Sequence, residues 1–141
     1  MKRILIVDDE PDVNLALRIV LEENNFIVDS FNDPLLALEN FEANLYDVLI
    51  LDIKMPKKDG FELYKEIMKI DNRVKVCFLT AGDVNYRSLK DTFPTLGENQ
   101  FIRKPIENTE LIRRVNKIIS LNEWNKYRNH LPWLYLSGRE R

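Results

Sequence analysis

Short apolar runs alternate along the chain with segments whose apolar residues recur every three or four positions. A short continuous apolar run is typical of a strand buried on both faces, and the three-to-four spacing is typical of an amphipathic helix. The pattern predicts strands at residues 4–7, 26–31, 48–51, 74–79 and 101–102. It predicts helices at residues 13–21, 35–41, 61–68, 84–93 and 111–119, with the helix at 84–93 the weakest of the five.

The strict alternation of strands and helices defines the fold class. Five strand-helix pairs indicate an α/β fold, in which a parallel sheet carries helices on both faces. The crossovers between its strands are expected to be right-handed. A length of 141 residues suits one domain with a short appendage. We place the domain at residues 1–121 and a C-terminal extension at residues 122–141, although the last helix is allowed to continue through this boundary.

Local signals indicate how several helices begin and which faces they bury. Pro34 suits the first position of the second helix, and Asn108 or Thr109 is expected to cap the last one. Asp59-Gly60 is interpreted as a turn. The expected apolar faces of the first two helices are Val13, Ala16, Leu17, Val20 and Leu21, and then Leu35, Leu38 and Phe41.

Composition narrows the possible functions. The 21 Lys and Arg residues against 23 Asp and Glu give a net charge of −2, which argues against a nucleic-acid binder driven by bulk charge. The single Cys77 excludes an internal disulfide, and the single His130 disfavours a histidine-based metal or triad site. No apolar stretch approaches the ~20 residues of a membrane span or the pattern of a signal peptide, so we expect a cytoplasmic protein.

Polar side chains stand where the predicted strands end. Asp8 and Asp9 end the first strand, Asp52 the third, Thr80 the fourth and Lys104 the fifth. Ligands of open parallel sheets sit at this carboxyl edge, so the five side chains are expected to converge there. Clustered carboxylates without histidine or cysteine favour Mg²⁺. An aspartate beside such a cation can attack phosphorus and form an aspartyl-phosphate, which a lysine and a hydroxyl would stabilise.

The four motifs at this edge, taken together, resemble those of the receiver domain of two-component response regulators. The matching strings are ILIVDDEP at residues 4–11, DVLILDIKMP at 47–56 with Asp59-Gly60, LTAG at 79–82 and FIRKPI at 101–106. The resemblance covers residues 1–121 in order. It implies a flavodoxin-like, doubly wound sheet with the strand order 2-1-3-4-5.

The resemblance also implies a role for each site residue. Asp52 would be the phosphoacceptor, and Mg²⁺ would be held by Asp8, Asp9, Asp52 and the backbone carbonyl of Lys54. Thr80 would bond the phosphoryl group, Lys104 would pair with it through a segment that contains a cis Lys104-Pro105 bond, and Phe101 would be the switch aromatic. The protein would then be a phosphorylation-dependent signalling switch and not a metabolic enzyme. Its partners would be a sensor histidine kinase or phosphotransfer protein and a downstream protein target.

Three other functions were weighed on the same residues. A haloacid-dehalogenase-like phosphohydrolase needs a second aspartate two residues after the nucleophile, where this chain has Lys54. A flavin-binding protein of the same fold would need a phosphate-cradling loop after the first strand, where Asp8 and Asp9 would repel phosphate. The intact set of five site residues argues against a phosphate-independent interaction module.

Two features depart from the family pattern. The first is Lys54, which puts an ammonium two residues after Asp52, at a position that the family varies and that lies near the path of the hydrolytic water. The second and more serious one follows Thr80. Residues 93–99 (FPTLGEN) replace the small-residue turn that many receivers carry before strand five, and we expect the surface formed by helix 4, strand 5 and helix 5 to be reshaped. Residues 122–141 contain Trp124, Tyr127, Trp133 and Tyr135, with four basic residues against two acidic ones. This extension is expected to be partly helical and too short for a DNA-binding domain. Self-association, folding back onto the domain, disorder and weak membrane contact remain alternatives for it.

Overall fold

The computed structural model describes residues 1–81, 97 and 100–121. The strands are β1 (Arg3–Val7), β2 (Ile27–Phe31), β3 (Val48–Asp52), β4 (Lys75–Thr80) and β5 (Phe101–Arg103). The helices are α1 (Pro11–Glu23), α2 (Pro34–Asn40), α3 (Gly60–Ile70) and α5 (Asn108–Ile119). The predicted helix at residues 84–93 and the extension at 122–141 lie outside the described residues.

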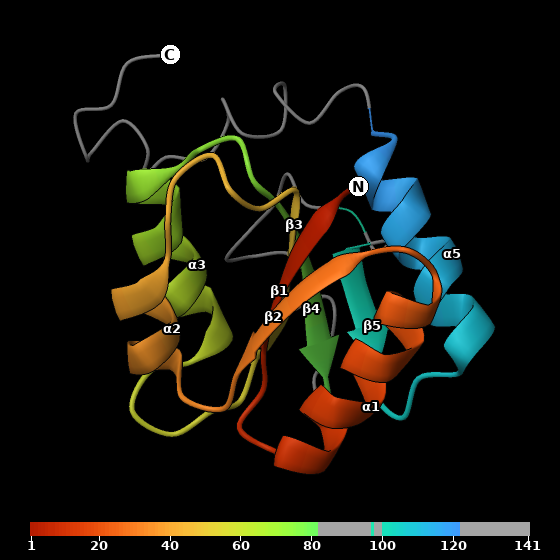
Figure 1. Cartoon of the computed structure of the whole chain (residues 1–141). Coiled ribbons are helices and arrows are strands. Elements are labelled where there is room, and N and C mark those ends of the chain that lie inside the picture. Colours follow the sequence, from red (N-terminus) through yellow and green to blue (C-terminus); the bar gives the residue numbers. More distant parts are fainter. Residues whose placement is uncertain (82–96, 98–99, 122–141) are drawn as a thin grey trace.

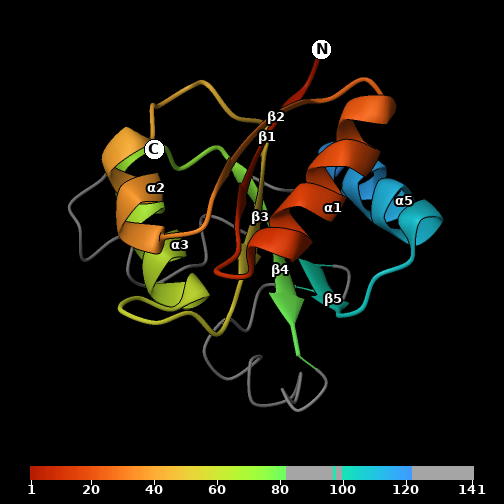
Figure 2. The ribbon, with the colours of Figure 1, turned by 60° about the horizontal axis from the view of Figure 1, so that its bottom comes forward.

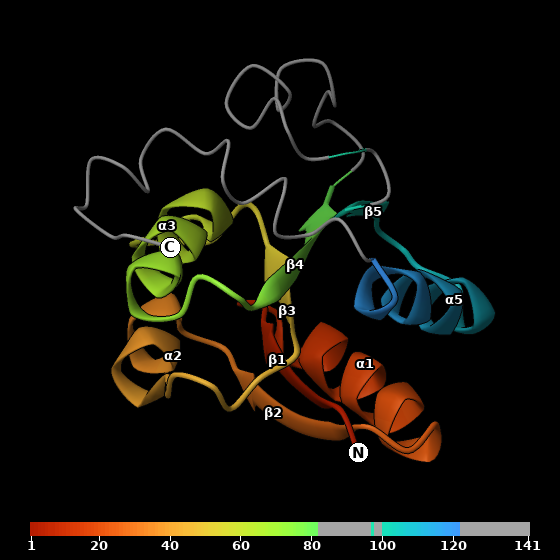
Figure 3. The ribbon, with the colours of Figure 1, turned by 90° about the horizontal axis from the view of Figure 1, so that it is seen from above.

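The strands form one parallel sheet in the order β2-β1-β3-β4-β5, which confirms the predicted fold class and topology. Helices α1 and α5 cover one face of the sheet, and α2 and α3 cover the other (Figures 1 and 3). Strand β3 is buried along all five residues because it has a neighbouring strand on each side and helices over both faces. The continuous apolar run at this position reflects that double burial.

Alternating side chains of each strand supply two separate apolar layers. Ile4 and Ile6 of β1 pack with residues of α1 and α5, such as Leu17 and Val115. Leu5 and Val7 point to the opposite face and pack with α2 and α3. Because the side chains of a strand alternate between the faces of a sheet, this one strand stabilises both layers and fixes the height at which Asp8 leaves the sheet.

The predicted faces of two helices are confirmed for most of their residues, with one exposed exception in each helix. In α1 the buried residues are Asn14, Leu17 and Leu21, whereas Ala16 is exposed. In α2 Pro34 and Ala37 are buried, and Leu35 is 46% exposed. Helix α2 has only seven residues, so its packed face is narrow and Leu35 lies outside it. The prediction that Pro34 begins this helix is confirmed.

The beginnings of α3 and α5 also correct the sequence analysis. Asp59 does not form a simple turn with Gly60; it caps α3, accepting a bond from the backbone N–H of Glu62, whose carboxylate accepts one from Asp59 N–H. This reciprocal arrangement is a capping box. The cap of α5 is Glu107, which accepts from Glu110 N–H, and neither Asn108 nor Thr109.

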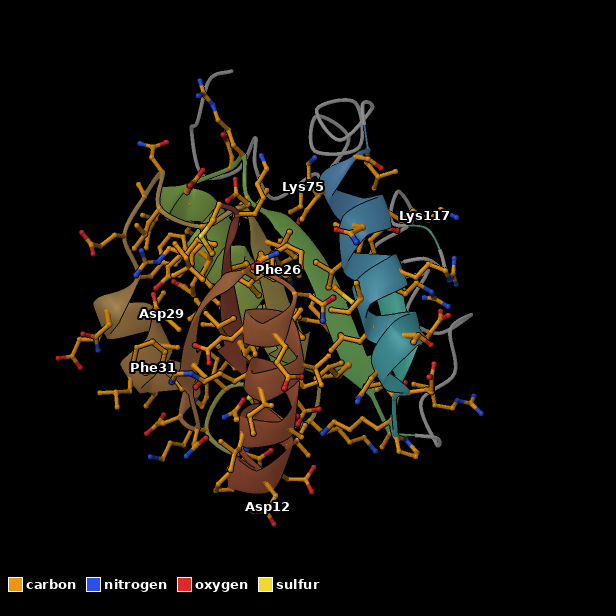
Figure 4. The ribbon with its side chains drawn as sticks, turned by 45° about the vertical axis from the view of Figure 1, so that its right-hand side comes forward. Asp12, Phe26, Asp29, Phe31, Lys75 and Lys117 are labelled. Carbon is orange, nitrogen blue, oxygen red and sulfur yellow. The ribbon has the colours of Figure 1, made fainter. Side chains whose placement is uncertain are left out.

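A lysine of β4 bonds the residues that follow α5, where the last described segment of the chain ends. Helix α5 ends at Ile119 and does not continue through Leu121. The Lys75 ammonium, at the first residue of β4, donates to the carbonyl oxygens of Ile119 at 2.6 Å and Leu121 at 3.4 Å. Figure 4 shows Lys75 near this end of α5, and Asp12 at the opposite end of the molecule. None of the described helices is long and apolar enough to cross a membrane.

Candidate functional site

The candidate residues lie where the ladder of each strand ends. Asp8 N–H donates to the Phe31 carbonyl at 3.2 Å, and Ile53 N–H, directly after Asp52, donates to the Leu79 carbonyl at 3.0 Å. Lys104 N–H donates to the Thr80 carbonyl at 2.8 Å. These bonds continue the sheet by one step beyond the strands. The backbones of the site residues are therefore held by the sheet, at the carboxyl edge that comes forward in Figure 2.

Three carboxylates converge at this edge, as predicted from their positions after the strands. One oxygen from each of Asp8, Asp9 and Asp52 lies within 4.8 Å of the others. Asp8 and Asp52 are buried, and Asp9 is half-buried. Oxygen ligands in this number suit Mg²⁺, which binds a few carboxylates and completes its shell with water and phosphate oxygens. The donor set of the cluster fits that ion.

A single ammonium group compensates the cluster. The Nζ atom of Lys104 lies 2.8 Å from Asp8 Oδ2, 2.9 Å from Glu10 Oε1 and 3.4 Å from Asp52 Oδ1. Asp8 uses its other oxygen locally, because its Oδ1 accepts from Glu10 N–H at 2.9 Å. Lys104 is thus an ion-pair partner of three carboxylates at once.

The electrostatics of the site favour either protonation of its carboxylates or the binding of a cation. Burial, and then repulsion from Asp8, raise the pKa of Asp52 to about 7. Burial also raises the pKa of Asp8, although the bond from Lys104 opposes that shift. Burial alone would lower the pKa of Lys104, but its bonds to Asp8 and Glu10 outweigh this and raise it. At neutral pH the site therefore holds partly uncompensated negative charge, which a divalent ion would neutralise.

The other predicted residues lie on β4 and β5 and in the loops that follow β3 and β5. Thr80 is buried at the end of β4, opposite Arg103 in register. Phe101 is half-buried, and its ring stacks on Phe78 with centroids 5.5 Å apart. The side chain of Lys54 is exposed in the loop after β3, and Lys104-Pro105 is a cis bond, as the resemblance implied.

Sequence reasoning missed two residues that bear directly on the site. The sequence motif assigns Glu10 no role of its own, but its carboxylate contacts the Lys104 ammonium at 2.9 Å. Gly60 begins α3 against the backbone of Asp52, where an added Cβ would lie 2.3 Å from the Asp52 carbonyl oxygen. The Gly60 N–H also donates to the Ile53 carbonyl at 2.8 Å. Nothing in the sequence indicates that Glu10 contacts Lys104. Gly60 could have been identified, because a glycine at the first position of a predicted helix can be read from the sequence.

An open cavity of about 530 Å³ lies beside Lys104, between α1 and the loop that joins β5 to α5. Its apolar lining includes Val13, Leu17 and Ile106, and its polar rim includes Glu10, Asp12 and Lys104. Lys104 therefore belongs both to the carboxylate cluster and to the edge of a largely apolar hollow. A molecule in that hollow would lie next to the cluster.

Comparison with known proteins identifies the class of the domain. A family model described as the response regulator receiver domain matches residues 4–116. The chain belongs to this family, which serves two-component signalling, and its topology and acidic cluster agree with that membership. The receiver domain of HemR from Leptospira biflexa is 30% identical with a TM-score of 0.75, covering 86% of this chain and 97% of that one.

The other relatives are regulatory proteins by name. TrrA from Thermotoga maritima, in a structure with Mg²⁺ and BeF, is 32% identical with a TM-score of 0.68, over 84% of this chain and 99% of that one. The transcriptional activator protein IrlR from Burkholderia pseudomallei is 36% identical over 117 residues, which is 83% of this chain and 50% of IrlR. The chain spans about half the length of the curated relatives it matches.

Proposed function

We propose that this protein is a signalling switch that accepts a phosphoryl group on Asp52 in the presence of Mg²⁺. The observation that carries the proposal is the convergence of Asp8, Asp9 and Asp52 within 4.8 Å, with Lys104 Nζ 3.4 Å from Asp52. In the proposed reaction an oxygen of the Asp52 carboxylate attacks phosphorus, and the bond from phosphorus to the donor's leaving group breaks. The leaving group departs with the bonding electrons, as an acetate ion from acetyl phosphate or, from a phosphohistidine donor, as an imidazole that takes up a proton.

The proposed roles are those that the resemblance to receiver domains implies, and the positions of the side chains support them. Mg²⁺, held by Asp8, Asp9, Asp52 and the Lys54 carbonyl, would neutralise charge on the phosphoryl oxygens. Lys104 would pair with one of these oxygens, and the Thr80 hydroxyl would donate to another. Phe101, stacked at the end of the same sheet, would follow a movement of Thr80 and alter the surface around β5.

The proposed partners match those of a receiver domain. A sensor histidine kinase or a phosphotransfer protein would supply the phosphoryl group, and the open cavity beside Lys104 offers a surface for such a donor. A downstream protein would bind the altered surface. Several relatives, of which the matched part makes up about half, are named transcriptional regulators, so control of transcription through a further module is the output that these names favour. Self-association stays a prediction.

Acetyl phosphate with Mg²⁺ is expected to add one phosphoryl group to the wild-type protein, because a small donor needs only the site itself. The Asp52→Asn variant, which lacks a nucleophilic oxygen, is expected to stay unmodified. Intact-mass spectrometry measures the result. The exposed Asp12 provides the control, since Asp12→Asn should be modified like the wild type. An unmodified wild type, or equal modification of Asp52→Asn, would contradict the proposal.

Replacing Glu10 by glutamine is expected to accelerate this phosphorylation by about two- to fivefold. Glu10 competes with the incoming phosphoryl group for Lys104, but its side chain is 61% exposed, and exposed ion pairs are worth only ~0.2–1 kcal/mol. Rates measured with acetyl phosphate at low and high salt would test this, with a smaller effect at high salt. The control is Glu22→Gln, which removes an exposed ion pair between Glu22 and Arg18 on α1. A slower Glu10→Gln variant would show that Glu10 assists the reaction.

A further inference from the structure

Asn14 is a polar residue in an otherwise apolar buried row. It shares the inner face of α1 with Leu17 and Leu21, and it is 3% exposed. An asparagine buried in the first turn of a helix, as Asn14 is in α1, is unfavourable unless its amide finds hydrogen-bond partners. Its position therefore requires an explanation in terms of the groups that it contacts.

The amide of Asn14 acts as a donor to three oxygens. Its Nδ2 donates to the Asp8 carbonyl at 2.8 Å, to the Phe31 carbonyl at 3.0 Å and to the Asn32 side-chain oxygen. Its own Oδ1 is buried and has no hydrogen-bond partner among the described residues. Turning the amide over would place Oδ1 against two backbone carbonyl oxygens, which cannot donate. The surrounding acceptors therefore fix its orientation.

The bond to Asp8 acts on the peptide that joins the two adjacent aspartates. The Asp8 carbonyl belongs to the planar peptide unit between Asp8 and Asp9, so fixing this oxygen fixes the direction in which Asp9 continues. The other bonds of this turn, from Asp8 N–H and to Asp8 Oδ1, lie on either side of that peptide. The Phe31 carbonyl receives both Asp8 N–H and Asn14 Nδ2, which ties the turn to the end of β2.

We propose that Asn14 is a positioning residue for the metal site, setting the Asp8-Asp9 peptide so that both carboxylates face Asp52. The inference rests on the proposed binding of Mg²⁺. Residues that orient metal ligands from behind commonly change metal affinity by ~10–100-fold when they are replaced. Asn14 acts through the backbone of its neighbours and not by contact with the ion.

The test is Mg²⁺ binding by isothermal titration calorimetry, without any phosphodonor, on the full chain. Asn14→Leu keeps the approximate shape of the side chain and removes its donors, and we expect its Kd for Mg²⁺ to rise about tenfold. The matched control is Asn24→Leu, because Asn24 is an exposed residue at the end of α1 whose amide donates only to the Val20 carbonyl. The Kd of this control should stay within about twofold of the wild type, allowing for the context dependence of such effects.

Circular dichroism and thermal melting separate positioning from stability. A residue with only a structural role would lower the melting temperature without changing the Kd of the folded protein. A folded Asn14→Leu protein with the wild-type Kd overturns the inference alone, while a wild type that binds no Mg²⁺ overturns both the inference and the proposed function. If Asn14→Leu does not fold, Asn14→Ser provides the same comparison.

Discussion

Replacing Gly60 by alanine is expected to lower the free energy of unfolding by about 2–3 kcal/mol and the melting temperature by roughly 6–12 °C. The added Cβ would lie 2.3 Å from the Asp52 carbonyl oxygen and 3.1 Å from the Ile53 Cα atom. Both neighbours are backbone atoms at the end of the central strand, so they cannot rotate away as a side chain would. Either α3 moves outward or the end of β3 moves. Urea denaturation followed by circular dichroism measures the loss.

The same substitution is expected to slow phosphorylation of the folded protein by at least about tenfold. The backbone that the new methyl group would push carries Asp52, and a misplacement of ~1 Å at a reacting group can reduce a rate by ~100-fold. The control is Gly97→Ala, whose Cβ, among the residues that the structure describes, would meet the side-chain oxygen of Gln100 at 3.2 Å. A Gly60→Ala protein with wild-type stability and rate would show that α3 can retreat without disturbing Asp52.

The second large effect is a dependence of stability on pH that Asp52 imposes. Its pKa is about 7 in the folded protein and has the ordinary value of 3.8 when the chain is unfolded. Between these values the folded state binds more protons than the unfolded state, so the free energy of unfolding falls as the pH rises from about 4 to 7. Without metal, the protein should therefore be more stable at pH 5 than at pH 8.

Asp52→Asn is expected to remove much of this dependence. At pH 8 the amide carries no charge next to Asp8, and we expect the variant to be more stable than the wild type by about 1–3 kcal/mol. At pH 5 the wild-type carboxyl is protonated and resembles the amide, so the two proteins should differ little. Chemical denaturation in EDTA at both pH values measures the difference. Mg²⁺ should stabilise the wild type more at pH 8 than at pH 5, because protons compete with it.

Asp33→Asn gives a control of opposite sign. Asp33 accepts from Leu35 N–H and from Lys57, and these bonds lower the pKa of its carboxyl. Its favourable contribution is present above its ordinary pKa and is lost in acid, so the substitution should lower the stability at pH 8 and not raise it. If Asp52→Asn instead destabilised the metal-free protein at pH 8, attraction to Lys104 would outweigh burial and repulsion from Asp8.

The sequence predicts the fold and the carboxylate cluster because both depend on simple periodicities. Continuous apolar runs mark strands buried on both faces, and parallel strands bring their carboxyl ends to one edge, so Asp8 and Asp52 converge even though 44 positions separate them. The ends of the elements depend on single hydrogen bonds. The caps Asp59 and Glu107 were missed for that reason, although Asp59 with Glu62 three positions later has the spacing of a capping box.

The contacts of Asn14 and Glu10 could not be predicted from the spacing of apolar residues. Asn14 stands three residues before Leu17 and seven before Leu21, so it lies on the buried face, but the apolar spacing alone favoured Val13 and Ala16. A polar residue at a buried helical position was the signal that could have identified it. The contact between Glu10 and Lys104 joins residues 94 positions apart. It depends on the side-chain conformations of both residues, which no periodic pattern specifies.

The hydrogen bonds from Lys75 to the Ile119 and Leu121 carbonyls fix the position at which the described part of the domain ends. Thr80 and Lys75 stand at opposite ends of β4, whose six residues extend over ~20 Å. Charges near the surface are largely screened beyond ~8 Å at physiological ionic strength. The charge of a phosphoryl group on Asp52 would therefore have little direct effect on a module attached after Leu121. Its influence on such a module would have to travel as displacement of packed atoms, through the strand itself or around the surface of the domain.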